Sequence, residues 1–600
     1  LFRNYAATQL TAPIHAALAA HDSLILLDEA HCSAPFAQTL DAIQLYRGDR
    51  WAESPLNTPF AFVLLSATPR SGLEQADIFP GPDVQQALDH PLLLARIFAS
   101  KPARLFPLPH KRKTDEDPLV AKAQELVAEH IRQGCVRTAV IMNRVRTAQL
   151  VAEGLQATQA NIGVILLTGR LRPIERDALI DAWLPYLRAE SPRTPQMPLV
   201  VVSTQCLEVG ADFSFDALIT EAASLDALRQ RFGRLNRLGT SSNASAAILI
   251  RERDMDARDE DPVYGKALSH CWKLLEELAQ TSSSQEHVDF GIHALDTALS
   301  SIPTERLEDC AAPAPDAPAL LPAHLDLLCQ TAPPPAIEPE VSLYLHGRDR
   351  TVPEAYLVWR ADLTPDNPSI WPEAVSLCPP LAGELLSVPL YRLRSWLGAP
   401  DSPDDTHDVE GSLQQQLPKA AAAYRPFLLW RGRDSSFVDR DPEQIVPGDI
   451  VVVPAAYGMD NIGQATRHKA LGEAGLDLWE PALAATDRPP AVRLHHTVLA
   501  PWLDCPPLRQ LVELVSTPGF ETEDLWTAVD TLLAYQPLAP EESQPPPSWW
   551  LELLSSVRGG RIEQHPAGGI VLFSRRPRAA APLSVPDLFA DEDDLASTAD

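Results

Sequence analysis

The sequence has few cysteines, and none of them is arranged as a paired metal site would need. Its 600 residues include 8 cysteines, and no two of these form the C-x-x-C pair that holds zinc in many structural sites. They lie far apart, at Cys32, Cys135, Cys206, Cys271, Cys310, Cys329, Cys378 and Cys505. The spacing therefore favours a reduced, cytoplasmic setting.

A membrane-spanning run and an excess of positive charge are also lacking. No uncharged apolar stretch is long enough to cross a bilayer, and the opening LFRNYAATQLTAPIH lacks the basic start and apolar centre of a signal peptide. Lys and Arg number 50 against 80 Asp and Glu, and the net charge of −30 argues against indiscriminate adhesion to nucleic acid or anionic membranes. Because the first residue is Leu1, we expect a processed or incomplete polypeptide.

The length and the apolar pattern predict several domains, the first two of α/β type. A chain of 600 residues exceeds what one core supports, so about three or four domains are expected. Up to Glu252, short apolar runs such as FAFVLLSAT and PLVVVST alternate with amphipathic stretches, which is typical of parallel sheets covered by helices. The predicted divisions are a first α/β lobe over 1–100, a charged linker over 101–118 and a second α/β lobe over 119–255.

The C-terminal half has a different pattern. Helical spacing predicts an extension over 256–309, and the Ala- and Pro-rich stretch 310–340 predicts an irregular connection with one short helix. The strand-like runs VSLYLHG, EAYLVWRADL, PFLLWRG and DIVVVPAAYG predict a mixed, mainly β accessory region over 341–580. The acidic stretch 581–600 is typical of a linker.

An acidic pair, Asp28 and Glu29, follows the apolar run SLILL. Two adjacent carboxylates at the end of a buried strand cost desolvation free energy unless a cation lies beside them. In a nucleotide hydrolase, one carboxylate holds Mg²⁺ through water and the next orients or deprotonates the attacking water. The alternative is a solvated strand end that happens to be acidic.

Two hydroxyl residues, Ser66 and Thr68, follow the next strong apolar run in LLSATPR. Alone, this is an ordinary end of a strand. If the two strands are neighbours, a hydroxyl could hydrogen-bond His31 and respond to events at the phosphate.

Three arginines recur at a spacing of three residues in LRQRFGRLNRLG. Arg231, Arg234 and Arg237 would lie on neighbouring parts of one helical face, where like charges repel each other, so the pattern favours an anionic counterpart. The guanidinium fork suits phosphate and can stabilise the charge on a transferring phosphoryl group. The alternative is an exposed basic helix.

The stretches LLTGRLRPIER and VVVSTQCLEVGADFSFD each follow an apolar run with hydroxyl, glycine or arginine residues. This composition can hold phosphates through backbone N–H groups and side chains. Neither stretch is specific alone.

Taken in order, DEAH, SAT, LLTGR, STQCLEVGADF and QRFGRLNRLG resemble the motifs of superfamily 2 helicases. In that superfamily, two RecA-like lobes enclose ATP and bind nucleic acid across their top. Asn236 in GRLNR, together with LFRNYAAT, PIHAAL, DSLILLDEAHCSAPF and LYLHG, resembles the CRISPR-associated helicase-nuclease of type I systems, in its I-U (I-G) branch. The resemblance implies an ATP-dependent motor that is recruited by an RNA-guided surveillance complex, translocates on single-stranded DNA and cuts it with a metal-dependent HD nuclease.

The resemblance also implies a role for each matching residue. Asp28 would hold Mg²⁺ through water, Glu29 would activate water, and His31, Ser66 and Thr68 would couple the nucleotide to motion. The side chains meeting the γ-phosphate from the opposite lobe would be Gln230, Arg234 and Arg237, with Gly210 and Asp212 ordering that cleft. Contacts to the DNA backbone would come from Thr168, Arg170 and Thr204.

Two features of the resembled family are missing from this sequence. No G-x-x-x-x-G-K-[ST] loop is present, since the Gly265–Lys266 pair is followed by Ala267. No HD nuclease pattern is present either, because His21–Asp22 precedes the DEAH run and His407–Asp408 lies in an acidic stretch without helical spacing. The nuclease and its transition metal are therefore expected only beyond this chain. His495–His496 is interpreted as a packed or surface pair.

Two other functions remain open at this point. A general DNA-repair or restriction helicase would carry the same motor motifs. A non-catalytic nucleic-acid-binding or partner-binding fragment would also fit the missing phosphate loop.

We expect the chain as given to bind Mg-ATP weakly or not at all, because it has no phosphate-binding loop or its lysine. Titration calorimetry tests this expectation. Low-micromolar binding, roughly −8 kcal/mol, would contradict it.

Overall fold

The computed structural model of the protein describes residues 22–55, 58–66, 90–109, 117–158, 161–189, 193–208, 212–241, 243–256, 260–281, 287–313, 316–330, 341–347, 353–398, 424–458, 477–536 and 545–575. The chain divides into two compact units, each described by itself below. The first comprises Leu1–Ile165, Thr194–Thr351 and Asp408–Ser412, and the second comprises Leu166–Arg193, Val352–His407 and Leu413–Asp600. Among the described residues, no helix is both long and apolar enough to span a bilayer.

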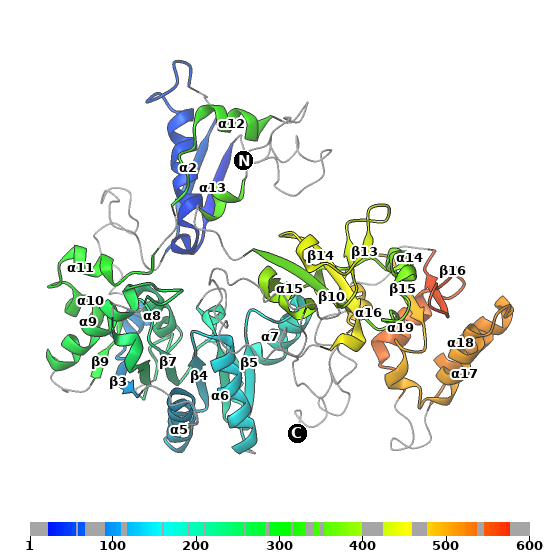
Figure 1. Ribbon diagram of the computed structural model, residues 1–600. Coiled ribbons are helices and arrows are strands. Elements are labelled where there is room, and N and C mark those ends of the chain that lie inside the picture. The colour runs from blue at the N-terminus through cyan, green and yellow to red at the C-terminus, as the bar shows by residue number, and fades with distance from the viewer. Residues whose placement is uncertain are drawn as a thin grey trace. The chain divides into compact units, whose positions relative to one another are not determined.

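A seven-stranded sheet forms the main body of the first unit (Figure 1), in the order β5-β6-β4-β7-β8-β3-β9. From β6 to β3, each strand runs parallel to its neighbour in the sheet. The edge strand β9 is antiparallel to β3. The strands are β3 (Pro102–Leu108), β4 (Arg137–Ile141), β5 (Gly163–Leu167), β6 (Leu199–Ser203), β7 (Ala217–Glu221), β8 (Ser245–Arg251) and β9 (His287–Asp289). Every residue of β6 and β7 is buried, as expected for strands covered on both faces.

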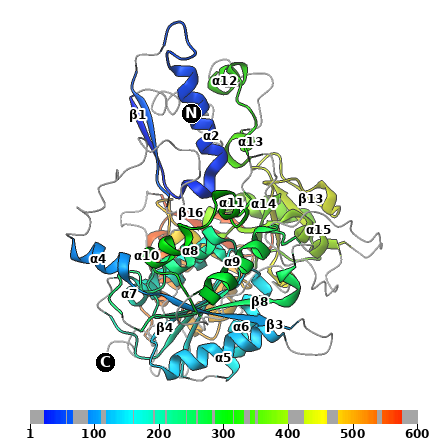
Figure 2. The same cartoon turned by 90° about the vertical axis from the view of Figure 1, so that its left-hand side faces the viewer.

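Helices cover both faces of this sheet. One face carries α5 (Pro118–Arg132) and α6 (Val145–Thr158), and the other carries α8 (Leu225–Gly233) and α9 (Ala267–Thr281) (Figure 2). Short helices complete the body: α4 (Pro91–Phe98), α10 (Ile292–Leu299) and α11 (Thr304–Asp309). The α/β class with a parallel sheet is confirmed.

A smaller layer in the first unit contains the acidic pair. Strands β1 (Ser23–Leu27) and β2 (Phe60–Leu64) run parallel, and α2 (Ala34–Arg47) packs with α12 (Pro322–Cys329) and α13 (Ser342–His346) around Ile43, Leu320, Leu328 and Tyr344. Leu24 and Leu26 of β1 are 61% and 62% exposed. This pair of strands therefore has an exposed apolar face, which is unusual for a parallel arrangement.

Two predictions about local structure are wrong. The expected linker over 101–118 contains β3, which lies between β8 and β9; its prolines and Arg104 concealed the strand pattern. The run VSLYLHG, predicted as a strand, forms helix α13. The short helix expected within 310–340 is present as α12.

The second unit contains two sheets and helix α7 (Pro173–Leu187). The five-stranded sheet has the order β11-β10-β14-β12-β13, with β10 and β14 parallel. Its strands are β10 (Glu354–Arg360), β11 (Leu386–Pro389), β12 (Phe427–Trp430), β13 (Phe437–Asp439) and β14 (Ile450–Pro454). Leu357 and Trp359 pack toward α15 (Leu390–Gly398), whereas Val358 packs toward α14 (Trp371–Leu377), as the alternation of a strand requires.

The second sheet of this unit is antiparallel, in the order β15-β17-β16. Its strands are β15 (Ala491–Leu494), β16 (Arg561–Gln564) and β17 (Ile570–Phe573), and its core includes side chains from α16 (Trp479–Ala484), α17 (Pro506–Ser516), α18 (Thr522–Leu533) and α19 (Ser548–Ser556). Three of the runs predicted as strands in the C-terminal half are present, as β10, β12 and β14.

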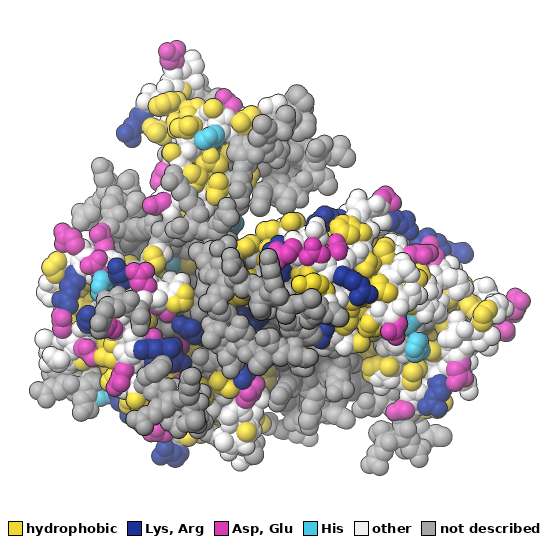
Figure 3. Space-filling model, viewed as in Figure 1, with side chains coloured by type: hydrophobic (Ala, Val, Ile, Leu, Met, Phe, Trp, Pro, Cys, Tyr) yellow, Lys and Arg dark blue, Asp and Glu magenta, His cyan; other side chains and the backbone are white. Residues whose placement is uncertain are grey.

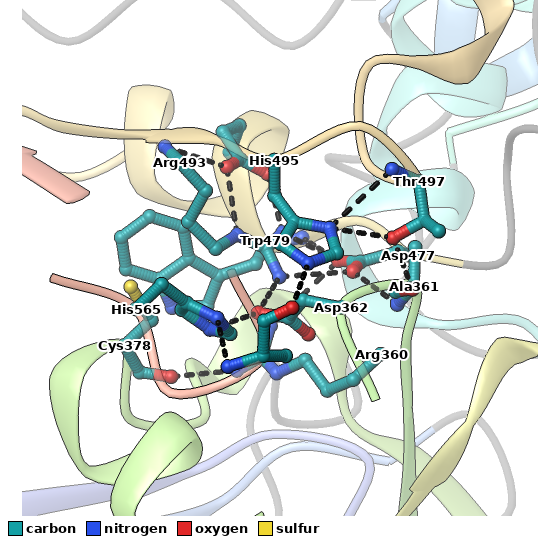
Figure 4. A network of polar contacts seen from close by, with 12 residues as sticks. Arg360, Ala361, Asp362, Cys378, Asp477, Trp479, Arg493, His495, Thr497 and His565 are labelled. Carbon is teal, nitrogen blue, oxygen red and sulfur yellow. Dashed lines mark hydrogen bonds and ion pairs between the residues drawn. The ribbon is translucent and has the colours of Figure 1, made fainter. Parts of the chain in front are cut away.

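A buried polar network joins the two sheets of the second unit. Arg493 of β15 donates to Asp477 (2.8 Å), to Glu480 (2.8 Å) and to Asp362 (3.0 Å), which follows β10 (Figure 4). His565 Nε2 lies 3.1 Å from the same Asp362 oxygen. Burial alone would raise the pKa of Asp362, but Arg493 and His565 hold it well below its usual range.

We predict that Arg493→Met destabilises the second unit by about 3–5 kcal/mol, because it removes the cation shared by buried carboxylates. Urea unfolding measures the change. The matched control is Arg558→Met, which removes an arginine from the exposed pair with Asp530 and should change stability little. Equal, small shifts for both variants would contradict the prediction.

Candidate nucleotide-hydrolysis site

The acidic pair lies at the carboxyl end of β1, where open parallel sheets bind ligands. Glu29 adopts a left-handed backbone conformation with φ of 48°, and its N–H donates to the Asp28 carboxylate at 2.9 Å. Ala30 N–H then donates to Leu65 O at 3.0 Å, which ties this turn to the end of β2. A positive φ in a glutamate costs backbone energy, so the turn is held by these surrounding contacts.

The side chain of Asp28 is suited to an outer-sphere Mg²⁺ contact. The residue is exposed, and one of its carboxylate oxygens, Oδ1, accepts the hydrogen bond from Glu29 N–H. Mg²⁺ usually keeps several waters and is held by one or two carboxylates plus substrate phosphates, so this arrangement fits the ion. Among the residues that the structure describes, no cluster of three or more His, Cys, Asp or Glu side chains could hold a metal directly.

His31 connects the acidic pair with two other predicted elements. Its Nδ1 lies 3.1 Å from Ser66 Oγ and 3.5 Å from Glu29 Oε2. Its Nε2 contacts the amide nitrogen of Gln230 on α8. The predicted hydrogen bond between Ser66 and His31 is therefore present, whereas Thr68 and Gly210 lie outside the described residues.

The prediction of three arginines on one helical face is wrong. Helix α8 ends at Gly233, Arg234 caps it, and Asn236 turns the chain with φ of 41°. Asn236 closes this turn through its amide, which donates to Ser241 O at 2.7 Å and accepts from Ser241 N at 3.1 Å. Asparagine tolerates this conformation better than most residues, which gives a physical role to the GRLNR form.

Each arginine has a different environment. Arg231 is fully buried and pairs with Glu208 at 2.8 Å, so its anionic counterpart is a protein carboxylate. Arg237 pairs with Asp212 at 2.7 Å and is partly exposed. Arg234 donates to the carbonyls of Leu207 (3.3 Å) and Glu208 (2.6 Å).

Several charged groups act on Arg234. Burial and the charge of Arg237 lower the pKa of Arg234, while the carboxylates of Glu29, Asp212 and Glu208 act in the opposite direction. Burial raises the pKa of Glu208, and the charge of Arg231 opposes that rise. Arg234 and Arg237 are thus two neighbouring guanidinium groups that share their surroundings with the carboxylates of Glu29, Asp212 and Glu208.

The predicted DNA contacts belong to different units of the chain. Thr168 and Arg170 fall in the second unit and Thr204 in the first. Their exposed fractions are 2%, 6% and 1%. Their role in binding DNA stays a prediction, and it requires these residues to become accessible.

The sequence patterns missed the residues that surround Arg231. Asn143 follows β4, Glu208 follows β6, and Tyr264 lies in the loop before α9; all three contact the Arg231 guanidinium. Glu208 and Asn143 follow apolar strands, so a search for polar residues at strand ends could have found them. Tyr264 lies within the range predicted as a helical extension but precedes α9, and nothing in the sequence indicates its contact.

Comparisons with known proteins match parts of this chain. The family model "CRISPR-associated nuclease/helicase Cas3, C-terminal" matches residues 133–240. The CRISPR-associated nuclease/helicase Cas3 of Haloferax volcanii is 36% identical over 77 residues, which are 13% of this chain and 8% of that protein. The Cas3 of Streptococcus thermophilus is 32% identical over 113 residues, 19% of this chain and 12% of the relative.

Solved structures also align with the chain. The crystal structure of T. fusca Cas3 with AMPPNP has 18% identity and a TM-score of 0.39, over 72% of this chain and 51% of that one. The chain thus spans about half the length of that structure and a smaller share of the curated relatives. Residues 133–240, which contain β4 to β7, α8 and the arginines that follow it, are the part of the chain that is similar to the C-terminal Cas3 model.

Proposed function

We propose that this chain contains most of the motor of an ATP-dependent DNA helicase of type I CRISPR interference, in the I-U (I-G) branch. The observation that carries the proposal is the contact of His31 with both Ser66 and Gln230. This contact links the acidic pair to the helix that precedes Arg234 and Arg237, which supports a site formed by two layers of the first unit. The match of residues 133–240 to the Cas3 model supports the same function.

The proposed roles follow from charge and position. Asp28 would hold Mg²⁺ through water, and the ion would supply charge neutralisation at the phosphates. Glu29, beside Asp28 and 3.5 Å from His31, would orient and deprotonate the attacking water. Arg234 and Arg237 would stabilise the charge that develops on the γ-phosphate, with Asp212 holding Arg237 in place.

The remaining roles are proposed from the resemblance. Single-stranded DNA and an RNA-guided surveillance complex are the proposed partners, in the cytoplasm, and the HD nuclease with its transition metal is proposed to lie in another part of the full-length protein. The exposed apolar face of Leu24 and Leu26 supports the proposal that the first lobe is larger than the described layer. Among the described side chains on the face in Figure 3, basic and acidic groups are interspersed, so DNA binding is proposed to depend on local contacts and not on a continuous basic surface.

We predict that Glu29→Gln in the full-length protein nearly abolishes DNA-stimulated ATP hydrolysis and leaves ATP binding largely intact. The substitution removes the carboxylate that accepts a proton but keeps the shape of the side chain. Steady-state hydrolysis and calorimetry measure the two effects. Glu53→Gln, at an exposed glutamate after α2, is the matched control.

A second variant tests the arginines. Arg237→Ala should slow hydrolysis on the order of 100-fold or more, through lost stabilisation of the transition-state charge. Arg50→Ala, at an exposed site, should have no such effect. Parental rates in both Glu29→Gln and Arg237→Ala would reject the motor and leave the binding-fragment function in its place. A repair or restriction helicase would instead hydrolyse ATP without any response to a surveillance complex.

A further inference from the structure

Arg231 is a buried arginine whose five N–H groups all have acceptors. Its Nε donates to Glu208 Oε1 at 2.8 Å. Its Nη1 donates to Thr220 Oγ1 at 2.7 Å and to Glu221 O at 2.9 Å. Its Nη2 donates to Asn143 Oδ1 at 3.0 Å and to the Tyr264 hydroxyl at 2.8 Å. With every donor occupied, this side chain has no hydrogen-bonding capacity left for an added anion.

Arg231 instead fixes the segment on which Arg234 is anchored. It holds the side chain of Glu208, while Arg234 donates to the main-chain carbonyls of Leu207 and Glu208. The same segment is a single turn, in which Leu207 N–H donates to Thr204 O at 3.3 Å and Glu208 N–H to Gln205 O at 2.9 Å. A displacement of Glu208 would therefore move the two acceptors that orient the Arg234 guanidinium.

Arg234, unlike Arg231, keeps donors for a ligand. Its hydrogen bonds to Leu207 and Glu208 use Nε and Nη2, and Nη1 donates to no residue that the structure describes. It also lies within the field of Glu29, the carboxylate proposed to act on the attacking water. The two arginines thus have different roles. Arg231 joins neighbouring segments of the protein, whereas Arg234 has a donor with which it can contact an anion.

Tyr264 completes the environment of Arg231 from a separate loop. Asp261 and Gly265 exchange backbone hydrogen bonds at 3.2 and 2.7 Å, and the Asp261 carboxylate accepts from Tyr264 N at 2.9 Å. Gly265, with φ of 55°, permits this tight turn. The loop holds the Tyr264 ring buried, with its hydroxyl 2.8 Å from Arg231 Nη2 and 3.4 Å from Gln205 Nε2.

We propose that Tyr264 and Arg231 are positioning residues that orient Arg234 toward the terminal phosphate, by fixing the Gln205–Glu208 turn. Tyr264 lies outside every helicase motif recognised in the sequence. The inference rests on the proposed function for its ligand, but the geometry that it invokes can be tested without hydrolysis.

The first experiment uses this chain and Tyr264→Phe, which removes one hydroxyl and keeps the ring. Hydrogen exchange should become faster at the amides of Leu207 and Glu208, because a buried Arg231 donor loses its acceptor. Tyr457→Phe is the matched control, since it removes a hydroxyl that donates to Pro426 O in the other unit. Unchanged exchange rates at the amides of Leu207 and Glu208 would overturn the inference, whether or not the chain hydrolyses ATP.

The second experiment uses the full-length protein. Tyr264→Phe should lower kcat for ATP on the order of tenfold while KM changes little. In an Arg234→Ala background the same substitution should change kcat by less than about twofold, because the group through which it acts is gone. Glu208→Gln, which keeps the shape and removes the charge, should follow the same pattern.

The outcomes separate the two proposals. An equal loss of kcat from Tyr264→Phe with and without Arg234 would indicate a merely structural tyrosine and would overturn the inference. A full-length protein without ATP hydrolysis would reject the proposed function, and the exchange measurement alone would then decide whether Tyr264 fixes the turn.

Discussion

A guanidinium in a protein interior needs an acceptor for each N–H, and this requirement organises the carboxyl edge of the seven-stranded sheet. The acceptors of Arg231 come from the ends of β4 and β7, from the turn after β6 and from the loop before α9. Parallel strands make this possible because their carboxyl ends meet at one edge. Burying the guanidinium costs desolvation free energy, which the ion pair with Glu208 and the other hydrogen bonds offset. These contacts fix four segments relative to one another.

In the second unit, a buried guanidinium also needs acceptors, and here they come from a different pair of layers. Arg493 on β15 is buried among Asp362, Asp477 and Glu480, and so ties the antiparallel sheet to the loop that follows β10. Replacing such a network with apolar residues can preserve stability, but removing one partner leaves buried charges uncompensated. In each unit, a buried arginine thus holds neighbouring elements together.

The sequence predicted those parts of the structure that depend on local patterns. Apolar runs such as PLVVVST form buried strands, and Asp28 and Glu29 directly follow β1, which coincides with the apolar run SLILL. β3 was missed because Pro102, Arg104 and Pro107 interrupt its apolar pattern, although neighbouring strands supply its burial and its hydrogen bonds. The prediction from the arginine spacing was wrong for a related reason. Residues three apart share a helical face only within a helix, and α8 ends at Gly233, before Arg234 and Arg237.

The role of Arg231 could not be predicted in the same way, because its partners are distant in the sequence and come together only in the fold. Asn143 lies 88 residues before it and Tyr264 lies 33 residues after it. Neighbouring residues of a helix point in directions about 100° apart. Gln230 can therefore contact His31 while Arg231 points into the interior, and the donors of Arg231 fix the rotation of α8 about its axis. The rotation of α8 determines whether Gln230 contacts His31 and in which direction the chain leaves the helix at Arg234. The fully buried Arg231 therefore influences the positions of both Gln230 and Arg234.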